Sequence, residues 1–276
     1  MRGAARSGTP VTKPFKVLAR GELIRTRIIR AMSEPHNRPH GRIRVVTFDL
    51  DDTLWAVGPV IAQAERLMWA WLGTHCPQMT ARYDRDGLLP MRAAVLAREP
   101  GLVHDIGRLR MAILDAALAA SGYGRADAER LAAGAFEVFM EERHRVAYFE
   151  HAETVLERLG RRFALGVVSN GNADVARLPI GRHFAFAISA AAVGASKPAP
   201  DVFRAALAAA GCRPEEMVHV GDHHDHDVAG AARLGIHTVW VNYHGDPFPG
   251  PERPSAEVGS LADLPAVLDR IATGRG

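Results

Sequence analysis

The sequence contains little cysteine. Cys76 and Cys212 are the two present, and they lie far apart and outside any CxxC pattern. This usage suits a reducing cytoplasm, which we predict as the location, and gives no support for a disulfide framework or a zinc site. No apolar run approaches the length of a membrane span, so a membrane is not an expected partner. The formal net charge of +3 is too small to favour nucleic acid as a partner.

The positive charge is concentrated at the N-terminus. Residues 1–42 are rich in arginine and lysine and contain Glu22 and Glu34 as their acids. This composition predicts a basic, flexible arm that is solvated by default. A presequence, a nucleic-acid tether and a true translation start at Met32 are the alternatives.

The chain is organised around a short apolar run that ends in acids. Residues 44–48 are mostly β-branched or aromatic, as in a buried parallel strand, and Asp49, Asp51 and Asp52 follow almost at once. In open α/β sheets, ligands bind beyond the carboxyl ends of the strands. Three carboxylates at that place need a cation or a shared proton, unless they form a solvated acidic turn.

The remaining pattern predicts two kinds of structure. Helical periodicity over 60–75, after a break at Gly58-Pro59, and over 88–98, 102–121 and 126–145 indicates an all-helical block. Beyond residue 151 strands and helices alternate, which predicts a parallel sheet of about five strands with helices on both faces. The expected fold is a Rossmann-like α/β core (43–55 and 151–276) with a helical cap (56–150) inserted in it. The expected strands are 163–169, 184–189, 217–222 and 238–241, and the expected core helices are 152–161, 199–210, 225–234 and 264–272.

Polar residues follow several of the predicted strands. Ser169 and Asn170 end one strand, Lys197 precedes a proline, and Asp222 ends another strand, with Asp225 and Asp227 close behind. Since the carboxyl ends of parallel strands lie along one edge of the sheet, these side chains are able to converge with Asp49 and Asp51. Taken singly, Ser169 is better explained as a turn residue and Lys197 as a solvated loop charge.

These four motifs, in this order over residues 45–242, resemble those of the haloacid dehalogenase-like hydrolase superfamily and its phosphatases with helical caps. The resemblance implies a nucleophile at Asp49, which would form an aspartyl phosphate. It also implies Mg²⁺ as the cofactor, held by the side chains of Asp49 and Asp222 and the backbone carbonyl of Asp51. Asp227 would orient metal-bound water or Lys197 from the outer shell.

The same resemblance assigns the other polar groups. Lys197 would neutralise the transferring phosphoryl group, while the Ser169 hydroxyl and the Asn170 backbone N–H would donate to its oxygens. Asp51 would protonate the leaving alkoxide and then deprotonate water. A dehalogenase expels halide and needs no such acid, so Asp51 favours phosphoryl transfer. A sugar phosphomutase and a non-enzymatic binding module are the alternative functions.

The fourth motif departs from the usual pattern of the superfamily. Histidines stand at 223 and 226, where small polar residues are expected, and His224 lies between them. The loop is either a site for a transition metal such as zinc or nickel, or a polar loop with internal hydrogen bonds.

The predicted cap carries charge on an otherwise apolar helix. Arg108 and, after it, His104 are the candidates for contact with substrate, against the alternative of an exposed helix face. By resemblance, the cap would close over the site and exclude water. Within the superfamily, the core motifs and the cap residues His104-Asp105, Arg108 and Arg110 are most similar to those of the bacterial phosphatases that act on the ribitylamino-uracil phosphate of riboflavin synthesis and on FMN. The expected partner is a small-molecule phosphate ester, and the expected state is a monomer or a homodimer.

Overall fold

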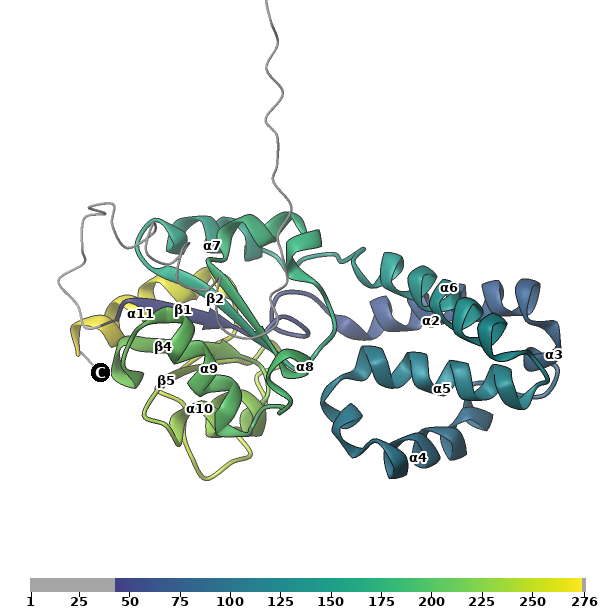
Figure 1. The fold of residues 1–276 in the computed structure, drawn as a ribbon. Helices are drawn as coiled ribbons and strands as arrows, with labels where there is room; N and C mark the ends of the chain where they lie inside the picture. Colours follow the sequence, from purple (N-terminus) through teal and green to yellow (C-terminus); the bar gives the residue numbers. More distant parts are fainter. Residues whose placement is uncertain (1–42, 275–276) are drawn as a thin grey trace, which may run out of the picture.

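A computed structural model describes residues 43–274 of the chain, so the predicted basic arm over 1–42 lies outside the described residues. The described part contains a six-stranded parallel sheet with the strand order β3-β2-β1-β4-β5-β6. A block of helices, α2–α6, extends to one side of it (Figure 1). The strands are β1 (Val45–Phe48), β2 (Ala164–Ser169), β3 (Phe186–Ser189), β4 (Met217–Gly221), β5 (His237–Val241) and β6 (Ala256–Val258).

Strand β1 lies near the centre of the sheet, and its register aligns the carboxyl ends of its neighbours. Phe48, its last residue, pairs with Val167 of β2 on one side and with Val220 of β4 on the other. The residues that follow these strands therefore emerge at one edge of the sheet. The strand register brings these residues together, although β2 begins more than a hundred residues after β1 in the sequence.

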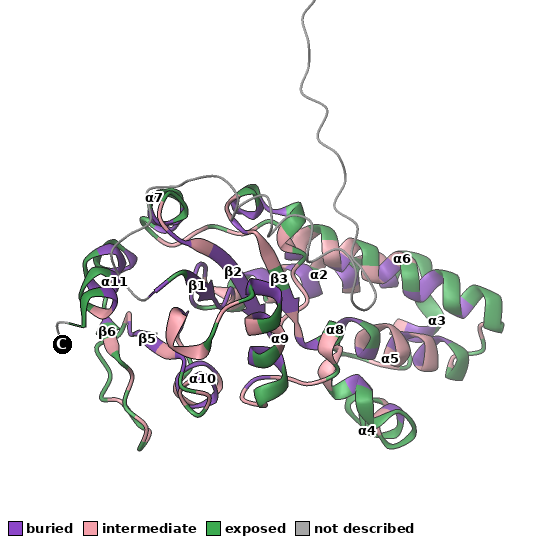
Figure 2. Cartoon of the chain, turned by 60° about the vertical axis from the view of Figure 1, so that its left-hand side comes forward, coloured by how far each residue is buried: buried purple, intermediate pink, exposed green. Residues whose placement is uncertain are grey.

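The sheet is buried on both faces. Alternate residues of β1 point to opposite sides, so Val46 and Phe48 join one apolar cluster and Val45 joins another. Helices α7 (Ala152–Gly160) and α11 (Leu264–Thr273) pack on the first face, whereas α9 (Pro200–Ala210) and α10 (Gly230–Ala232) pack on the second. In Figure 2 the buried residues gather along the strands and on the inner sides of these helices. A short helix, α8 (Ala190–Val193), follows β3.

The helical block has its own apolar core. It comprises α2 (Val57–His75), α3 (Pro77–Thr80), α4 (Leu89–Arg98), α5 (Ile106–Ala120) and α6 (Arg125–Arg143). Leu72, Leu118 and Phe139, from three different helices, are completely or almost completely buried in one cluster. The fold class expected from the sequence is thereby confirmed, while the residue limits of the domains stay predictions. None of the helices in residues 43–274 combines the length and apolar character needed to cross a membrane.

Several expected elements differ from those observed. Strand β6 was missed because it has only three residues and follows a proline-rich loop. Helix α2 begins at Val57, so Gly58-Pro59 is not a break; a proline is tolerated in a first turn, whose N–H groups have no partner within the helix. The helix expected over 102–121 is a 3₁₀ segment (Pro100–His104) followed by α5, because Asp105 caps α5. The helix expected over 225–234 is a π-helical turn (His224–Ala229) and then the short α10.

Gly166 of β2 supplies a test of packing in the strand that leads to the site. It pairs with Phe186 of β3, and a Cβ atom at Gly166 would overlap the Phe186 ring. Strand propensity favours Gly166→Val, but this overlap predicts a loss of about 1–3 kcal/mol in the free energy of unfolding, measured by urea denaturation.

Ala187→Val, at an exposed position of β3, is the control and should cause no loss. Adding Phe186→Ala to Gly166→Val should recover part of the stability, as a double-mutant cycle would show. Equal unfolding midpoints for Gly166→Val and the wild-type protein would contradict this account of the packing.

Candidate active site

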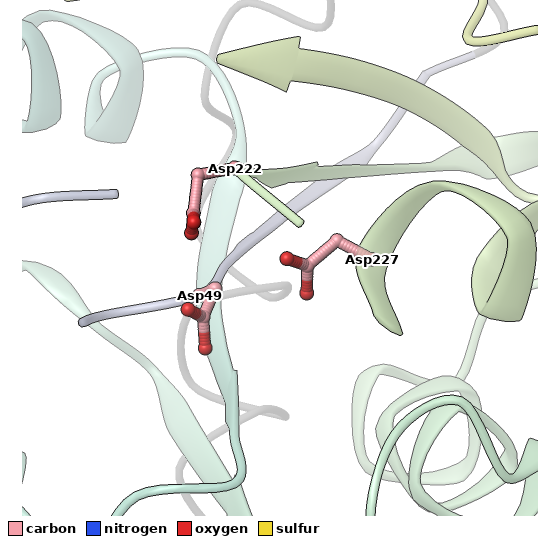
Figure 3. A group of neighbouring side chains, drawn as sticks. All are labelled: Asp49, Asp222 and Asp227. Atoms are coloured by element: carbon pink, nitrogen blue, oxygen red, sulfur yellow. The ribbon is translucent and has the colours of Figure 1, made fainter. Parts of the chain in front are cut away.

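Three carboxylates converge at the carboxyl edge of the sheet. Asp49 directly follows β1, Asp222 directly follows β4, and Asp227 belongs to the π-helical turn (Figure 3). One oxygen from each lies within 4.8 Å of the others. The backbone N–H of Asp49 donates to the carbonyl of Val220 at 2.9 Å, which extends the β1–β4 pairing by one residue and fixes where Asp49 leaves the sheet.

A buried ammonium joins two of these carboxylates. The Nζ atom of Lys197 lies 2.6 Å from Oδ1 of Asp49 and 2.6 Å from Oδ1 of Asp227. Asn170 holds the backbone of Lys197 in place from the end of β2. Its side-chain carbonyl accepts from the Lys197 N–H at 2.8 Å, and its amide donates to the Lys197 carbonyl at 3.0 Å. Two expected site residues from different loops are therefore bound to each other.

Asp227 is held by three donors. Besides Lys197, the Nε2 atom of His219 lies 3.0 Å from Oδ1, and the backbone N–H of His223 donates to Oδ2 at 3.0 Å. His219 is buried and its Nδ1 atom lies 2.9 Å from the hydroxyl of Thr47, so it fits a neutral ring that donates through Nε2 and accepts at Nδ1. Gly221 allows this arrangement, because a Cβ atom there would overlap the Asp227 carboxyl group.

Burial and the shared lysine shift the titration of the cluster. Burial raises the pKa of Asp49 to about 8, although Lys197 acts to lower it. Burial also raises the pKa of Asp222 to about 6, and the charge of Asp227 adds to this. Burial opposes the ionisation of Asp227 too, but Lys197 and His219 hold its pKa well below the usual range. Burial disfavours the charge of Lys197, yet Asp227 and Asp49 raise its pKa above the usual range.

These shifts describe three acids in a largely buried group, of which Asp49 and Asp227 share one cation and Asp222 has none. A hard divalent cation takes carboxylate oxygens as ligands and would offset the cost of burying the charges of Asp49 and Asp222. The donor set therefore fits such a cation. Asp227 already accepts three hydrogen bonds, which suits it to hold Lys197 in place.

Asp222 is oriented by residues of the first motif and of β5. The Thr53 hydroxyl donates to Oδ1 of Asp222 at 2.8 Å and accepts from the Asp222 N–H at 3.1 Å. The indole N–H of Trp240 donates to the Asp222 carbonyl at 2.6 Å. The turn before Thr53 includes Asp52 with a φ of 58°, a left-handed conformation that aspartate tolerates better than most residues.

The Asp51 carboxylate lies near the loop after β2 and is bound by two buried residues. The Nη2 atom of Arg143 donates to both oxygens, at 2.7 Å and 2.6 Å, and the indole N–H of Trp55 donates to Oδ1 at 3.0 Å. Ser169 lies at the start of the same loop, where its Oγ accepts the Gly171 N–H at 3.0 Å. The two residues expected to meet the phosphoryl group and the leaving group thus lie at the same edge of the sheet.

The two residues expected to contact substrate from the helical block differ in their surroundings. His104 contacts the α/β core: its Nδ1 atom lies 2.9 Å from the hydroxyl of Ser196, the neighbour of Lys197. The side chain of Arg108 is 71% exposed, and its nearest acidic partner is Glu99 at 4.0 Å. Substrate contact stays a prediction for both, with His104 the better placed.

The histidine-rich loop is held together by its own hydrogen bonds. The Nδ1 atom of His223 accepts from the backbone N–H groups of Asp225 and His226, each at 3.2 Å, and its ring stacks on His226 with 3.9 Å between centroids. Within residues 43–274, the side chains close enough to share a metal ion are the three aspartates of the cluster. The geometry supports the polar-loop alternative over a transition-metal site.

Three further residues of this site were not assigned from the sequence. His219 lies three residues before Asp222, and Thr53 directly follows the acids at 49–52, so their positions beside two of the motifs were a usable signal. Arg143 ends a helix more than ninety residues from Asp51 along the chain. Its sequence neighbourhood carries no motif, and only the fold brings it to the site.

The family model of the haloacid dehalogenase-like hydrolases matches residues 43–235, which include every residue of the aspartate cluster. The chain belongs to this family. The family predicted from the four motifs is thereby confirmed, and so is the prediction that the chain is an enzyme, a hydrolase.

Curated relatives and solved structures agree with this assignment. The chain is 31% identical over 235 residues to the 5-amino-6-(5-phospho-D-ribitylamino)uracil phosphatase YigB of Escherichia coli K12. This match covers 84% of the chain and 98% of that protein. The chain is 34% identical over 190 residues to a phosphoserine phosphatase of Thermus thermophilus, covering 67% of the chain and 70% of that protein. A crystal structure described as a 2-haloacid dehalogenase from Pseudomonas syringae matches with a TM-score of 0.81 and 41% identity, covering 83% of the chain and 99% of the other.

The aspartate cluster predicts that a divalent cation stabilises the folded chain. A ligand that binds only the folded state adds about 2.7 kcal/mol at a hundredfold excess over its Kd, so Mg²⁺ should raise the melting temperature. The increase should be larger at about pH 8 than at about pH 5, because Asp222, with its pKa of about 6, binds a proton below that pH and the cation must displace it.

Differential scanning fluorimetry with and without Mg²⁺ measures this effect. Asp222→Asn should remove most of the Mg²⁺-dependent shift. Asp225→Asn, which changes an acid in the same loop but outside the cluster, should retain it. A shift of equal size in both variants would mean that the ion binds elsewhere.

Proposed function

We propose that the chain is a Mg²⁺-dependent phosphatase that hydrolyses a small-molecule phosphomonoester through an aspartyl phosphate on Asp49. The contact that carries the proposal is the 2.6 Å ion pair between Lys197 and Asp49, beside the carboxylate of Asp222. This contact supports the proposal because a carboxylate oxygen, an ammonium and a second carboxylate lie close together, as nucleophilic attack beside a bound metal ion requires. The phosphatase names of two curated relatives support the same class of reaction.

Each residue of the cluster has a task in this reaction. A carboxylate oxygen of Asp49 attacks phosphorus, while the ammonium of Lys197 stabilises the charge on the phosphoryl oxygens. Asp49, Asp222 and the backbone carbonyl of Asp51 would hold Mg²⁺, which when bound neutralises phosphate charge and aligns the ester with the nucleophile. Asp227 keeps Lys197 directed at Asp49 through its own 2.6 Å contact.

The loop after β2 would receive the phosphoryl group. The Asn170 side chain makes two hydrogen bonds to the backbone of Lys197, which tie this loop, with the Asn170 N–H and the Ser169 hydroxyl, to the segment that carries the lysine. Donors that are fixed before the substrate arrives stabilise the transition state without reorganisation. The contacts thus support the roles in phosphate binding that the family resemblance implies.

Asp51 supports one of the two activities named among the similar proteins. The dehalogenase named for the Pseudomonas syringae structure makes halide release the second candidate function. Halide leaves without a proton, whereas an alkoxide needs one, and here a second carboxylate follows the nucleophile by two residues. We therefore favour phosphate ester hydrolysis, in which Asp51 gives a proton to the leaving oxygen and later takes one from water.

The substrate we propose is the ribitylamino-uracil phosphate of riboflavin synthesis, with FMN as a further candidate. The support is the match to the Escherichia coli enzyme, which extends over 98% of that protein and thus includes its counterpart of the helical block. The phosphoserine phosphatase among the relatives favours a broader metabolite phosphatase as the alternative. No contact among residues 43–274 favours a phosphomutase or a purely regulatory module.

Replacement of the two catalytic acids should give two different patterns. Asp49→Asn should reduce hydrolysis of every ester to the background rate, since no phosphoryl acceptor remains. Asp51→Asn should lower kcat/KM for an alkyl phosphate by about 10²–10⁴-fold, but much less for p-nitrophenyl phosphate, whose leaving group needs no proton.

Steady-state kinetics on the two esters checks these patterns, with Asp225→Asn as the matched control. Substantial turnover by Asp49→Asn would remove it as the nucleophile. An unchanged ratio of alkyl to aryl kcat/KM in Asp51→Asn would remove the acid role.

A panel of phosphorylated metabolites tests the substrate. With Mg²⁺ present, kcat/KM should be highest for the ribitylamino-uracil phosphate, with FMN next and phosphoserine and small sugar phosphates lower. Phosphate release is the measurement, and chloride release from a 2-chloro acid is run in parallel. Chloride release that depends on Asp49, without phosphatase activity, would establish the second candidate function instead.

A further inference from the structure

Arg143 is the last residue of α6, at the point where the helical block returns to the core. Its side chain is only 1% exposed, and it is among the largest fully buried side chains of the described residues. A guanidinium cannot lose its charge at ordinary pH, so the protein buries a permanent cation here.

The partners of this guanidinium belong to two separate loops of the site. Nη2 contacts both oxygens of Asp51, at 2.7 Å and 2.6 Å, and Nε donates to the side-chain carbonyl of Asn172 at 3.2 Å. The remaining nitrogen, Nη1, is buried and has no hydrogen-bond partner within residues 43–274. Arg143 thus connects the turn after β1 with the loop after β2.

The neighbouring residues confine the same carboxylate. The indole N–H of the fully buried Trp55 donates to Oδ1 of Asp51 at 3.0 Å. A Cβ atom at Gly171 would lie 2.5 Å from Oδ2, so the loop backbone approaches this oxygen as only glycine allows. The carboxylate is therefore fixed in position by an arginine, a tryptophan and a close backbone.

Stability alone is a poor explanation for this arrangement. A buried ion pair often contributes no more than an apolar pair of similar volume, because both ions lose their hydration. Here the guanidinium also leaves the buried Nη1 group without a partner, which adds a further cost. What this arrangement achieves is a fixed position for the two carboxylate oxygens of Asp51.

We propose that Arg143 is a positioning residue for the hydrolysis of the phosphoenzyme, because it fixes the Asp51 carboxylate that activates water. The inference rests on the proposed function. In this half-reaction the oxygen of water bonds to phosphorus, the bond between phosphorus and Asp49 breaks, and the proton of water passes to Asp51.

The proposal predicts a particular change in kinetics with p-nitrophenyl phosphate. In Arg143→Met, kcat should fall by about tenfold or more, because general-base assistance is worth about 10²–10⁴-fold. The value of kcat/KM should stay within about threefold of the wild type, since it reports the steps up to phenolate release, and KM should fall in parallel with kcat. Stopped-flow should show a burst of about one phenolate per active site as the phosphoenzyme accumulates.

Three other variants give the controls. Arg145→Gln changes an exposed arginine two residues away and should leave all parameters unchanged. Arg143→Lys keeps a cation with donors and should recover part of kcat. Trp55→Phe removes one donor to Oδ1 and should lower kcat in the same manner but to a smaller extent. If Arg143→Met does not fold, Arg143→Lys and Trp55→Phe test the proposal by the same split between kcat and kcat/KM.

Equal losses of kcat and kcat/KM, with KM unchanged and no burst, would overturn the proposal, because they indicate only a smaller folded fraction. Failure of the proposed function would give a different result: Asp49→Asn would retain the activity of the wild type, or the wild type would not hydrolyse phosphate esters at all.

Discussion

The ammonium of Lys197 is buried between the carboxylates of Asp49 and Asp227, and the geometry of the site depends on this contact. Without the lysine, two acids would face each other inside the protein, where like charges are costly. With the lysine in place, one oxygen of Asp49 contacts a fixed ammonium, and the pKa of Asp227 is held well below its usual range. The loops after β1 and β4 are thereby drawn towards the loop that carries Lys197.

The helical block is connected to this site by polar contacts as well as by the chain. Arg143 reaches Asp51 from the end of α6, and His104 reaches Ser196 from the segment before α5. Each contact ends on a residue at or beside a catalytic group of the proposed reaction. A displacement of the helical block relative to the core would therefore change the surroundings of Asp51 and of the lysine loop together.

The motifs in the sequence identified the cluster because their chemistry is local. Asp49 and Asp51 end an apolar run, and Asp222 ends another, so the strand pattern and the acids appear together in the sequence. The periodicity likewise indicated the helical block and the α/β core. It failed at elements that depend on their surroundings: the three-residue edge strand β6, the π-helical turn beside Asp227, and the first turn of α2, where Pro59 is accommodated.

The sequence by itself determined the family, the fold class and the aspartates, lysine and serine expected at the site, because motifs and hydrophobic periodicity are properties of neighbouring residues. Only the tertiary structure showed that hydrogen bonds join Asn170 to Lys197, His219 to Asp227 and Arg143 to Asp51. These pairs lie far apart along the chain or depend on the direction of a side chain. Their partners are set by strand register and helix packing, which no local pattern records.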